Sequence, residues 1–327
     1  MKKLDFVIAW VDGSDENHRL KRQQFQPENV VKGAAEDTRF AHNDEIYFSI
    51  ASILKYVPYC GTIYIITDHQ QPSFVGEFEA QGLCRSGQIQ VVDHQEIFRN
   101  YQQYLPTFNS LSIESMLWNI KGISNHFIYL NDDFFFNQQS DLSDFLIDGQ
   151  MVIYGHWQAT LIKKMKYIFR KFLQQNFGMV AEAKYSTAQM LSADRVGMTR
   201  YYEIHHRPHI LSRDLLSTYF KNNKELLDQQ IQFKFRNIDQ LLPVGLSNHL
   251  AIQSDQAILK DDIDIAYLKD GRDLEKCILA LSNSEIKFGC IQSLDQLESL
   301  AEGRIRAALI QKFTGFLPSQ IQPTTVV

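Results

Sequence analysis

The sequence is poor in the residues that mark unstructured or fibrous chains. Its 327 residues include only 16 glycines and 8 prolines, whereas 44% are hydrophobic and 22% are charged. This composition is that of an ordinary globular protein, and it excludes the disordered, collagen-like and low-complexity classes. The length suits either two domains or one large α/β domain that carries an inserted subdomain.

Cysteines are also few, and they are widely separated. Cys60, Cys84, Cys277 and Cys290 include no pair with the spacing of a metal site, so we expect buried thiols and a reducing compartment. No run of about 18 apolar residues is present that could span a membrane. The N-terminus runs directly into a strand-like segment, and acidic residues interrupt the apolar region that a signal peptide needs. We therefore expect the protein to act in the cytoplasm.

The chain lacks an excess of positive charge and the common nucleotide motifs. Its 33 basic and 38 acidic residues give a formal net charge of −5, so we expect no nucleic-acid partner, and any anionic ligand must be bound by a local cluster. The P-loop, G-x-G-x-x-G and G-x-S-x-G patterns do not occur. Their absence removes the usual support for P-loop kinases, dinucleotide-dependent oxidoreductases and α/β-hydrolases.

The first 136 residues alternate short apolar runs with helical patterns. Runs rich in β-branched and aromatic residues, typical of buried strands, lie at 4–11, 62–67, 88–92 and 126–130. Apolar residues recur at helical spacing over 44–56, 72–81 and 110–121. Strands that alternate with helices predict crossover connections and a mostly parallel sheet.

Polar residues follow three of these four strands. They are Asp12-Gly13-Ser14-Asp15, Asp68-His69 and Asn131-Asp132-Asp133. Because ligands of open α/β sheets bind at the carboxyl ends of the strands, we expect the functional site there. The adjacent carboxylates of Asp132 and Asp133 would repel one another unless a cation such as Mg²⁺ or Mn²⁺ lies with them. A turn in which both side chains bond to the backbone is the alternative.

The second half of the chain has a different composition. Residues 160–180 contain five basic residues and no acidic one, with apolar residues at helical spacing. This pattern predicts a basic amphipathic helix that either packs on the sheet or contacts an anionic membrane or acceptor. We expect residues 185–230 and 274–316 to be mostly helical as well.

A cationic cluster follows at His205-His206-Arg207-Pro208-His209, with Arg213, Lys234 and Arg236 further along. Its histidines suit a metal ligand, a general base or a phosphate ligand, and surface histidines in a loop are the alternative. No cysteine or carboxylate spacing supports zinc. Guanidinium groups bind phosphate oxygens in bidentate fashion, so an anionic donor fits this cluster better.

Three blocks of sequence occur in a distinctive order. They are DFVIAWVDGSD at 5–15, a long block from Arg39-Phe40 through Asp44-Glu45-Ile46 and LPTFNS at 105–110 to Asp132-Asp133, and HRPH at 206–209 with Arg213 and Arg236. In this order they resemble the Stealth family of bacterial capsular and surface polysaccharide sugar-1-phosphate transferases, which are related to the animal GlcNAc-1-phosphotransferase. Ala51 stands where that family usually has arginine, and no Asn-Asp pair follows Cys290.

The resemblance implies a Rossmann-like, GT-A-like core with a helical subdomain. Together with the change of composition along the chain, it leads us to expect a nucleotide-sugar and metal-binding half at 1–154, a helical subdomain with the His/Arg cluster at 155–245, and a C-terminal segment at 246–327 that packs on the core. It also implies a phosphotransferase that uses a UDP-sugar, UDP-GlcNAc or another UDP-hexose or HexNAc, and releases UMP when a glycan hydroxyl attacks the β-phosphorus.

The same resemblance assigns roles to residues. Asp132 and Asp133 would hold Mg²⁺ or Mn²⁺ at the diphosphate, with Asp133 also counted among the catalytic residues. The nucleotide and its phosphates would contact Trp10, Asp12, Gly13, Arg39, Arg213 and Arg236. His206 or His209, with His209 preferred, would take the proton of the acceptor hydroxyl.

Two other functions compete with this one. A GT-A glycosyltransferase would use the same site but release UDP, and a non-catalytic glycan-binding or assembly partner would release no nucleotide. The basic helix at 160–180 adds a predicted peripheral contact with the inner face of the membrane, where lipid-linked glycan acceptors are built.

Overall fold

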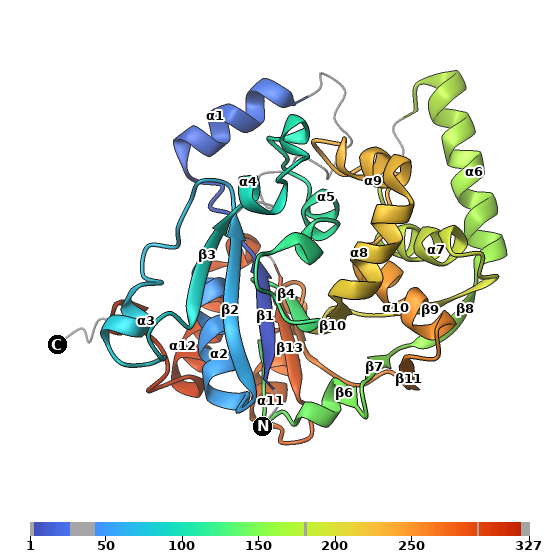
Figure 1. Cartoon of the computed structure of the whole chain (residues 1–327). Coiled ribbons are helices and arrows are strands. Elements are labelled where there is room, and N and C mark those ends of the chain that lie inside the picture. The colour runs from blue at the N-terminus through green and yellow to red at the C-terminus, as the bar shows by residue number, and fades with distance from the viewer. Residues whose placement is uncertain (1–2, 27–42, 180–181, 293, 322–327) are drawn as a thin grey trace.

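The central sheet has five strands and runs through the middle of the molecule (Figure 1). We describe it from a computed structural model that covers residues 3–26, 43–179, 182–292 and 294–321. The strands are β1 (Leu4–Ala9), β2 (Cys60–Thr67), β3 (Ile89–Asp93), β4 (His126–Asn131) and β10 (His209–Ser212). They lie in the order β10-β4-β1-β2-β3, with β1 to β4 parallel and β10 antiparallel to β4. The order 3-2-1-4 of the parallel strands is that of a Rossmann fold, so the predicted α/β class with a mostly parallel sheet is confirmed.

Three smaller sheets join distant parts of the chain. Their strands are β5 (Phe134–Phe136), β6 (Leu146–Ile147), β7 (Gln150–Tyr154), β8 (His156–Ala159), β9 (Arg200–Glu203), β11 (Ala257–Lys260), β12 (Ala266–Leu268) and β13 (Phe288–Ile291). β13 pairs with β5 directly after the Asp132-Asp133 pair, and β11 pairs with β7. The last 80 or so residues are therefore tied to the first half by backbone hydrogen bonds.

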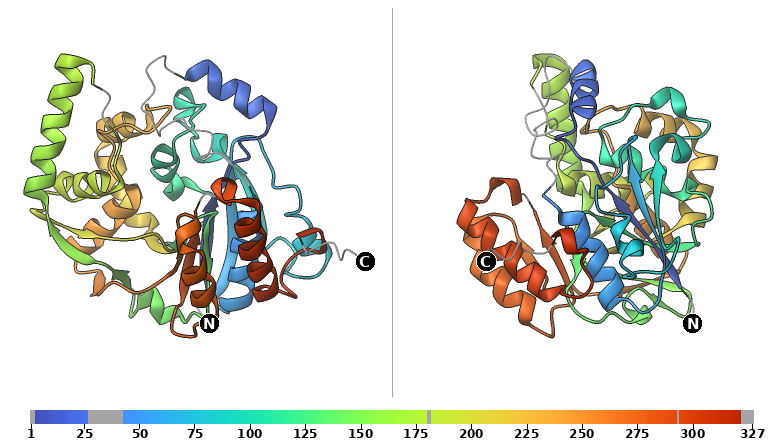
Figure 2. Two further views of the ribbon diagram at one scale, coloured as in Figure 1. Left: turned by 180° about the vertical axis from the view of Figure 1, so that it is seen from behind. Right: turned by 90° about the vertical axis from the view of Figure 1, so that its left-hand side faces the viewer.

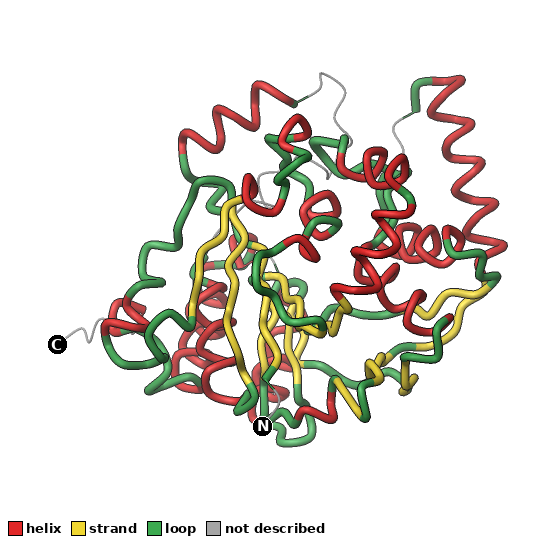
Figure 3. Tube along the Cα trace, viewed as in Figure 1, coloured by secondary structure: helices red, strands yellow, loops and turns green. Residues whose placement is uncertain are grey.

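Helices cover both faces of the central sheet (Figures 2 and 3). They are α1 (Glu16–Phe25), α2 (Glu45–Tyr56), α3 (Glu77–Ala80), α4 (His94–Ile97), α5 (Ser110–Glu114), α6 (Thr160–Phe177), α7 (Tyr185–Arg195), α8 (Arg213–Asn222), α9 (Lys224–Ile231), α10 (Pro243–Gln253), α11 (Leu274–Ser282) and α12 (Ser299–Lys312). Figure 2 shows α2, α11 and α12 together on one side of the sheet, with α8 on the other. Among the described residues, no helix is both long and apolar enough to cross a membrane.

The helix α2 is buried because it is apolar on nearly every side. Ile46, Ile50 and Ile53 are fully buried, and α2 lies between the sheet and the C-terminal helices. The Ser52 hydroxyl donates to the Ser49 carbonyl and accepts from the backbone N–H of Phe136 at 2.9 Å. The bond to Phe136 ties the second half of α2 to β5, the strand that follows the acidic pair.

Several predicted helices are shorter than their patterns suggest. The helix expected at 72–81 reduces to α3, since residues before Gly76 form turns. The helix expected at 110–121 ends at Glu114 and continues as a 3-10 turn over Leu117–Asn119, where the Trp118 indole donates to the Ser115 carbonyl. The ranges 185–230 and 274–316, expected to be mostly helical, also contain β9, β10 and β13.

Candidate functional site

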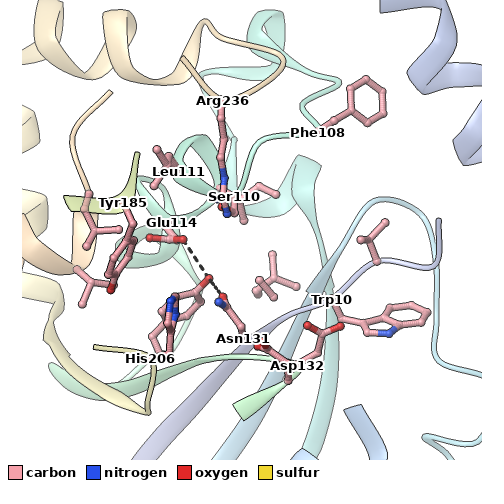
Figure 4. A pocket seen from close by; sticks show the side chains of 18 of the residues that line it. Trp10, Phe108, Ser110, Leu111, Glu114, Asn131, Asp132, Tyr185, His206 and Arg236 are labelled. Carbon is pink, nitrogen blue, oxygen red and sulfur yellow. Dashed lines mark hydrogen bonds between the residues drawn. The ribbon is translucent and has the colours of Figure 1, made fainter. Parts of the chain in front are cut away.

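A cavity of about 550 Å³ lies at the carboxyl ends of the parallel strands (Figure 4). Its walls include Trp10 after β1, Asp68 after β2 and Asn131, Asp132 and Asp133 at the end of β4. Parallel strands bring these ends to one edge, which is why three loops far apart in sequence meet here. The Lys21 ammonium bonds both carboxylate oxygens of Asp68, at 2.8 and 2.7 Å, so this acid is already neutralised.

Three further carboxylates on the cavity wall form no ion pair with any residue that the structure describes. Burial and the charge of Asp133 raise the pKa of Asp132 to about 8. Burial raises the pKa of Asp133 to about 7, with an added effect from Glu45. Burial and the charge of Asp132 likewise raise the pKa of Glu45, the first residue of α2, to about 7. These groups resist ionisation because they lie together away from water.

The acidic group has the properties that a hard divalent cation requires. Asp133 Oδ1 is buried and has no hydrogen-bond partner among the described residues, and Asp133 Oδ2 accepts only a weak bond from the Cys290 thiol at 3.4 Å. A buried oxygen without a partner is costly unless a ligand contacts it. Oxygen ligands from carboxylates are those that Mg²⁺ and Mn²⁺ take. Asp132, Asp133 and Glu45 therefore fit the predicted cation.

The opposite wall carries a buried acid beside a guanidinium. Glu114, at the end of α5, is 5% exposed, and its burial raises its pKa to about 7. The Tyr129 hydroxyl lies 3.3 Å from Glu114 Oε1 and 2.9 Å from Asn131 Oδ1, which links this wall to β4 (Figure 4). Arg236 points into the cavity and donates to the Ser110 hydroxyl at 2.7 Å. No carboxylate of the described chain lies within ion-pair distance of Arg236.

The three histidines of the cationic cluster point to different places. His205 lies near Asp262 at the surface, with 3.4 Å between Nε2 and Oδ1, and His156 also bonds that carboxylate. His206 lines the cavity, and its ring stacks on those of Tyr185 and Tyr267 at 5.1 and 6.2 Å. His209 lies within β10 and also lines the cavity. The cluster therefore does not converge on one metal ion.

His206 and His209 differ in their access to the cavity. Burial, with the nearby charges of His205 and Arg236, lowers the pKa of His206, so its imidazole is neutral at pH 7. His209 is 5% exposed, and its Nε2 is buried with no hydrogen-bond partner in the described chain. Its burial and the charge of Arg207 lower its pKa well below the usual value. Both are neutral, but His206 is the more exposed of the two.

Only one of the three residues after β1 that are expected to bind the nucleotide lines the cavity. Trp10 is buried in the cavity wall. Asp12 and Gly13 lie in the turn beyond it and do not line the cavity. The Asp12 carboxylate accepts from the backbone N–H and hydroxyl of Ser14, at 2.9 and 2.6 Å, and so closes its own turn.

Of the two remaining arginines, the structure describes only Arg213, which does not line the cavity. Arg213 follows β10, and because β10 is antiparallel to β4, Arg213 lies at the amino end of β4, where it donates to the Ile123 carbonyl at 3.1 Å. The structure thus puts Arg213 at the sheet edge opposite the acidic pair, and we do not propose it as a phosphate ligand. Arg39 lies outside the described residues.

Sequence reasoning missed Glu45, Glu114 and Tyr185 as parts of the site. Glu45 lies within the block that carries the Stealth resemblance. Its position at the start of a predicted helix gives no indication that it belongs to a site. Glu114 is a lone acid within the helical pattern at 110–121, which indicates a capping or ion-pair residue rather than part of a site. Tyr185 gives no signal in the sequence, since its stacking on His206 depends on how α7 approaches β10.

Known proteins match the parts of the chain that build this site. Residues 39–153 match the family described as Stealth protein CR2, conserved region 2. The chain is 39% identical over 145 residues to a capsular polysaccharide phosphotransferase of Actinobacillus pleuropneumoniae, an alignment that covers 43% of this chain and 38% of that protein. It is 30% identical over 271 residues to an exopolysaccharide phosphotransferase of Streptomyces coelicolor, which covers 82% of this chain and 27% of that protein. The chain thus spans well under half the length of these relatives.

Among solved structures, the chain is similar to WbbM, a bifunctional glycosyltransferase, with 8% sequence identity and a TM-score of 0.47 over 96% of this chain and 50% of that one.

The family match comprises β4, the acidic pair and Glu45, which together form one wall of the cavity. Residues 39–153 thus match Stealth conserved region 2, and the predicted resemblance of this chain to the Stealth family is confirmed.

Proposed function

We propose that this chain transfers a sugar-1-phosphate from a UDP-sugar to a glycan hydroxyl and releases UMP, in the synthesis of a capsule or another surface polysaccharide. The observation that carries the proposal is that one cavity combines a carboxylate group for a cation with an arginine and a neutral histidine. The names of the relatives, capsular and exopolysaccharide phosphotransferases, support the class of reaction. UDP-GlcNAc or another UDP-hexose or HexNAc is the proposed donor.

The donor diphosphate would lie between the two walls of the cavity. Asp132, Asp133 and Glu45 are the residues that would hold Mg²⁺ or Mn²⁺, and this cation would neutralise charge on the diphosphate oxygens. Arg236 would bind the phosphate oxygens from the other side, where its guanidinium donates in bidentate fashion. The Trp10 ring, at the edge of the cavity, would contact the nucleotide.

The acceptor hydroxyl would be activated by His206. His206 and His209 both line the cavity. His206 suits the role because it is neutral at pH 7 and is the more exposed of the two, whereas the Nε2 atom of His209 is buried. The acceptor O–H proton passes to the imidazole as the acceptor oxygen forms a bond to the β-phosphorus. The bond from the β-phosphorus to the bridging oxygen breaks, and UMP leaves with that electron pair. The product is a phosphodiester between the sugar and the acceptor.

The acceptor is proposed to be a glycan, in lipid-linked form. The protein would meet it at the inner face of the cytoplasmic membrane, through a peripheral contact of residues 160–180.

The nucleotide product tests the reaction. Purified protein incubated with UDP-GlcNAc, Mn²⁺ and a glycan acceptor should release UMP, and Asp132→Asn and Asp133→Asn should each lower the rate by at least about a hundredfold. Asp255→Asn, an exposed acid outside the cavity, is the matched control and should leave the rate unchanged. Release of UDP without UMP would show a glycosyltransferase instead. Failure to release nucleotide from any UDP-sugar tested would favour a non-catalytic assembly partner.

A further inference from the structure

The helix α6 stands apart from the rest of the fold. It has 18 residues, and in Figures 1 and 2 it extends away from the sheets at the side of the molecule. At 1.5 Å per residue it is about 27 Å long. It ends at Gly178, which has the left-handed φ of 63° that glycine adopts at helix ends.

The polar side of α6, and not its apolar side, faces the protein. Lys163 pairs with Glu203 at 3.5 Å, and Lys171 pairs with Asp239 at 3.0 Å. Lys164 likewise pairs with Asp194 on α7. These three lysines are held by intramolecular ion pairs, so they are not available to bind an external anion.

The apolar side of α6 faces outward. Six of its large apolar side chains are each more than half exposed, namely Leu161, Ile162, Met165, Ile168, Phe169 and Phe172. At 100° per residue these positions share one broad face of the helix. Six such side chains on one helix form an apolar patch of the kind that monomeric proteins rarely leave uncovered. We call this set the outward face of α6.

Two cations flank the outward face. Lys166 and Arg170 are one helical turn apart along one edge, and neither forms an ion pair with any described residue. The helix carries no acidic residue from 160 to 177. Two copies of α6 in contact would therefore bring like charges together with no carboxylate on either helix to balance them. An anionic lipid surface complements both the apolar face and its cationic edge.

We propose that the outward face of α6 docks on an anionic lipid bilayer, with its apolar side chains in the headgroup and acyl boundary and with Lys166 and Arg170 at the lipid phosphates. This proposal adds a membrane partner to the proposed function. It rests on the proposed function only for the nature of the acceptor. Ala183, Lys184 and Tyr185, just beyond α6, line the cavity. Docking would thus hold the cavity close to the surface at which a lipid-linked acceptor is anchored.

Vesicle co-sedimentation tests the docking without any enzymatic step. The full chain should sediment with vesicles of phosphatidylglycerol and phosphatidylcholine, and much less with phosphatidylcholine alone. The double variant Ile162→Ser/Phe169→Ser should lower the partition coefficient by about tenfold or more, and Lys166→Glu/Arg170→Glu should lower binding to the anionic vesicles only. Leu279→Ser/Leu300→Ser, at positions 71% and 79% exposed on α11 and α12, is the matched control and should bind as the parent does.

Three results would overturn the proposal. They are no binding to anionic vesicles, binding that the α6 variants leave unchanged, and a dimer in sedimentation velocity that Ile162→Ser/Phe169→Ser abolishes, which would identify a second copy as the occupant. Charge reversal of Lys163 or Lys164 is not diagnostic, because it breaks an ion pair within the fold. UMP release with a water-soluble acceptor is measured in parallel. A parent chain that does not bind vesicles but releases UMP refutes the docking alone, whereas a parent chain that docks but releases no UMP refutes the proposed reaction alone.

Discussion

Replacement of Glu114 by glutamine should make the free energy of unfolding less dependent on pH. In the folded protein, burial keeps the carboxyl protonated up to a pKa of about 7, against 4.5 ordinarily. Between those values the folded state binds more protons than the unfolded state, so stability falls as pH rises. At 1.36 kcal/mol per pKa unit the shift corresponds to roughly 3 kcal/mol, lost by pH 8. Glutamine keeps the shape and removes the proton, so the variant avoids this loss.

Urea unfolding at pH 4.5, 6, 7 and 8, in the presence of EDTA, measures the effect. The difference in unfolding free energy between Glu114→Gln and the parent should shift in favour of the variant by about 3 kcal/mol between pH 4.5 and pH 8. The other buried carboxylates are common to both proteins and cancel in the difference. Glu285→Gln, at an exposed position, should show no such trend. A difference that is flat, or that moves in favour of the parent as pH rises, would refute the reasoning.

Two further predictions concern the proposed chemistry. His206→Asn should lower kcat by about 10²- to 10⁴-fold. Because the pKa of His206 is lowered, the parent at a saturating concentration of Mn²⁺, which keeps the cation-binding carboxylates ionised, should keep its rate as pH falls to 6.5 and lose it only below that value. A larger loss in His209→Asn would assign the base to His209 instead. Arg236→Ala should weaken UDP binding by roughly tenfold or more in calorimetry, since hydrogen bonds to charged groups contribute about 1.5 to 3 kcal/mol. Arg272→Ala, at an exposed arginine, is its control, and equal affinity in both variants would exclude Arg236 as a phosphate ligand.

The sequence predicts the sheet well because each parallel strand is marked by its own apolar run. The same apolar runs predict where the acidic pair lies, because the pair directly follows the run that forms β4. Glu45 could not be placed that way, because its proximity to Asp132 depends on how α2 packs across the sheet. Arg213 shows that residue type alone can mislead. An arginine suits a phosphate ligand, but β10 runs antiparallel to β4, so Arg213 lies at the amino end of β4, away from the acidic pair.

The sequence also predicts that α6 is amphipathic, but it does not predict which side of the helix faces the protein. Periodicity identifies an apolar face and a basic face without indicating which one meets the protein. The outcome depends on Glu203, Asp194 and Asp239, which lie 30 to 70 residues away in the sequence and attract the lysine side inward.

The antiparallel pairing of β10 with β4 has a consequence for how this chain tolerates change. His209 lies opposite Tyr129, so the segment from residue 132 to 208 leaves and re-enters the sheet at the same edge. Its two ends are fixed by the ladder, independently of what lies between them. Insertions or deletions near α6 can therefore alter the surface of the molecule there. The histidine motif and the acidic pair would still keep the same distance from one another in space. The part of the cavity wall that β4 and β10 form can thus stay constant while the surface near α6 changes.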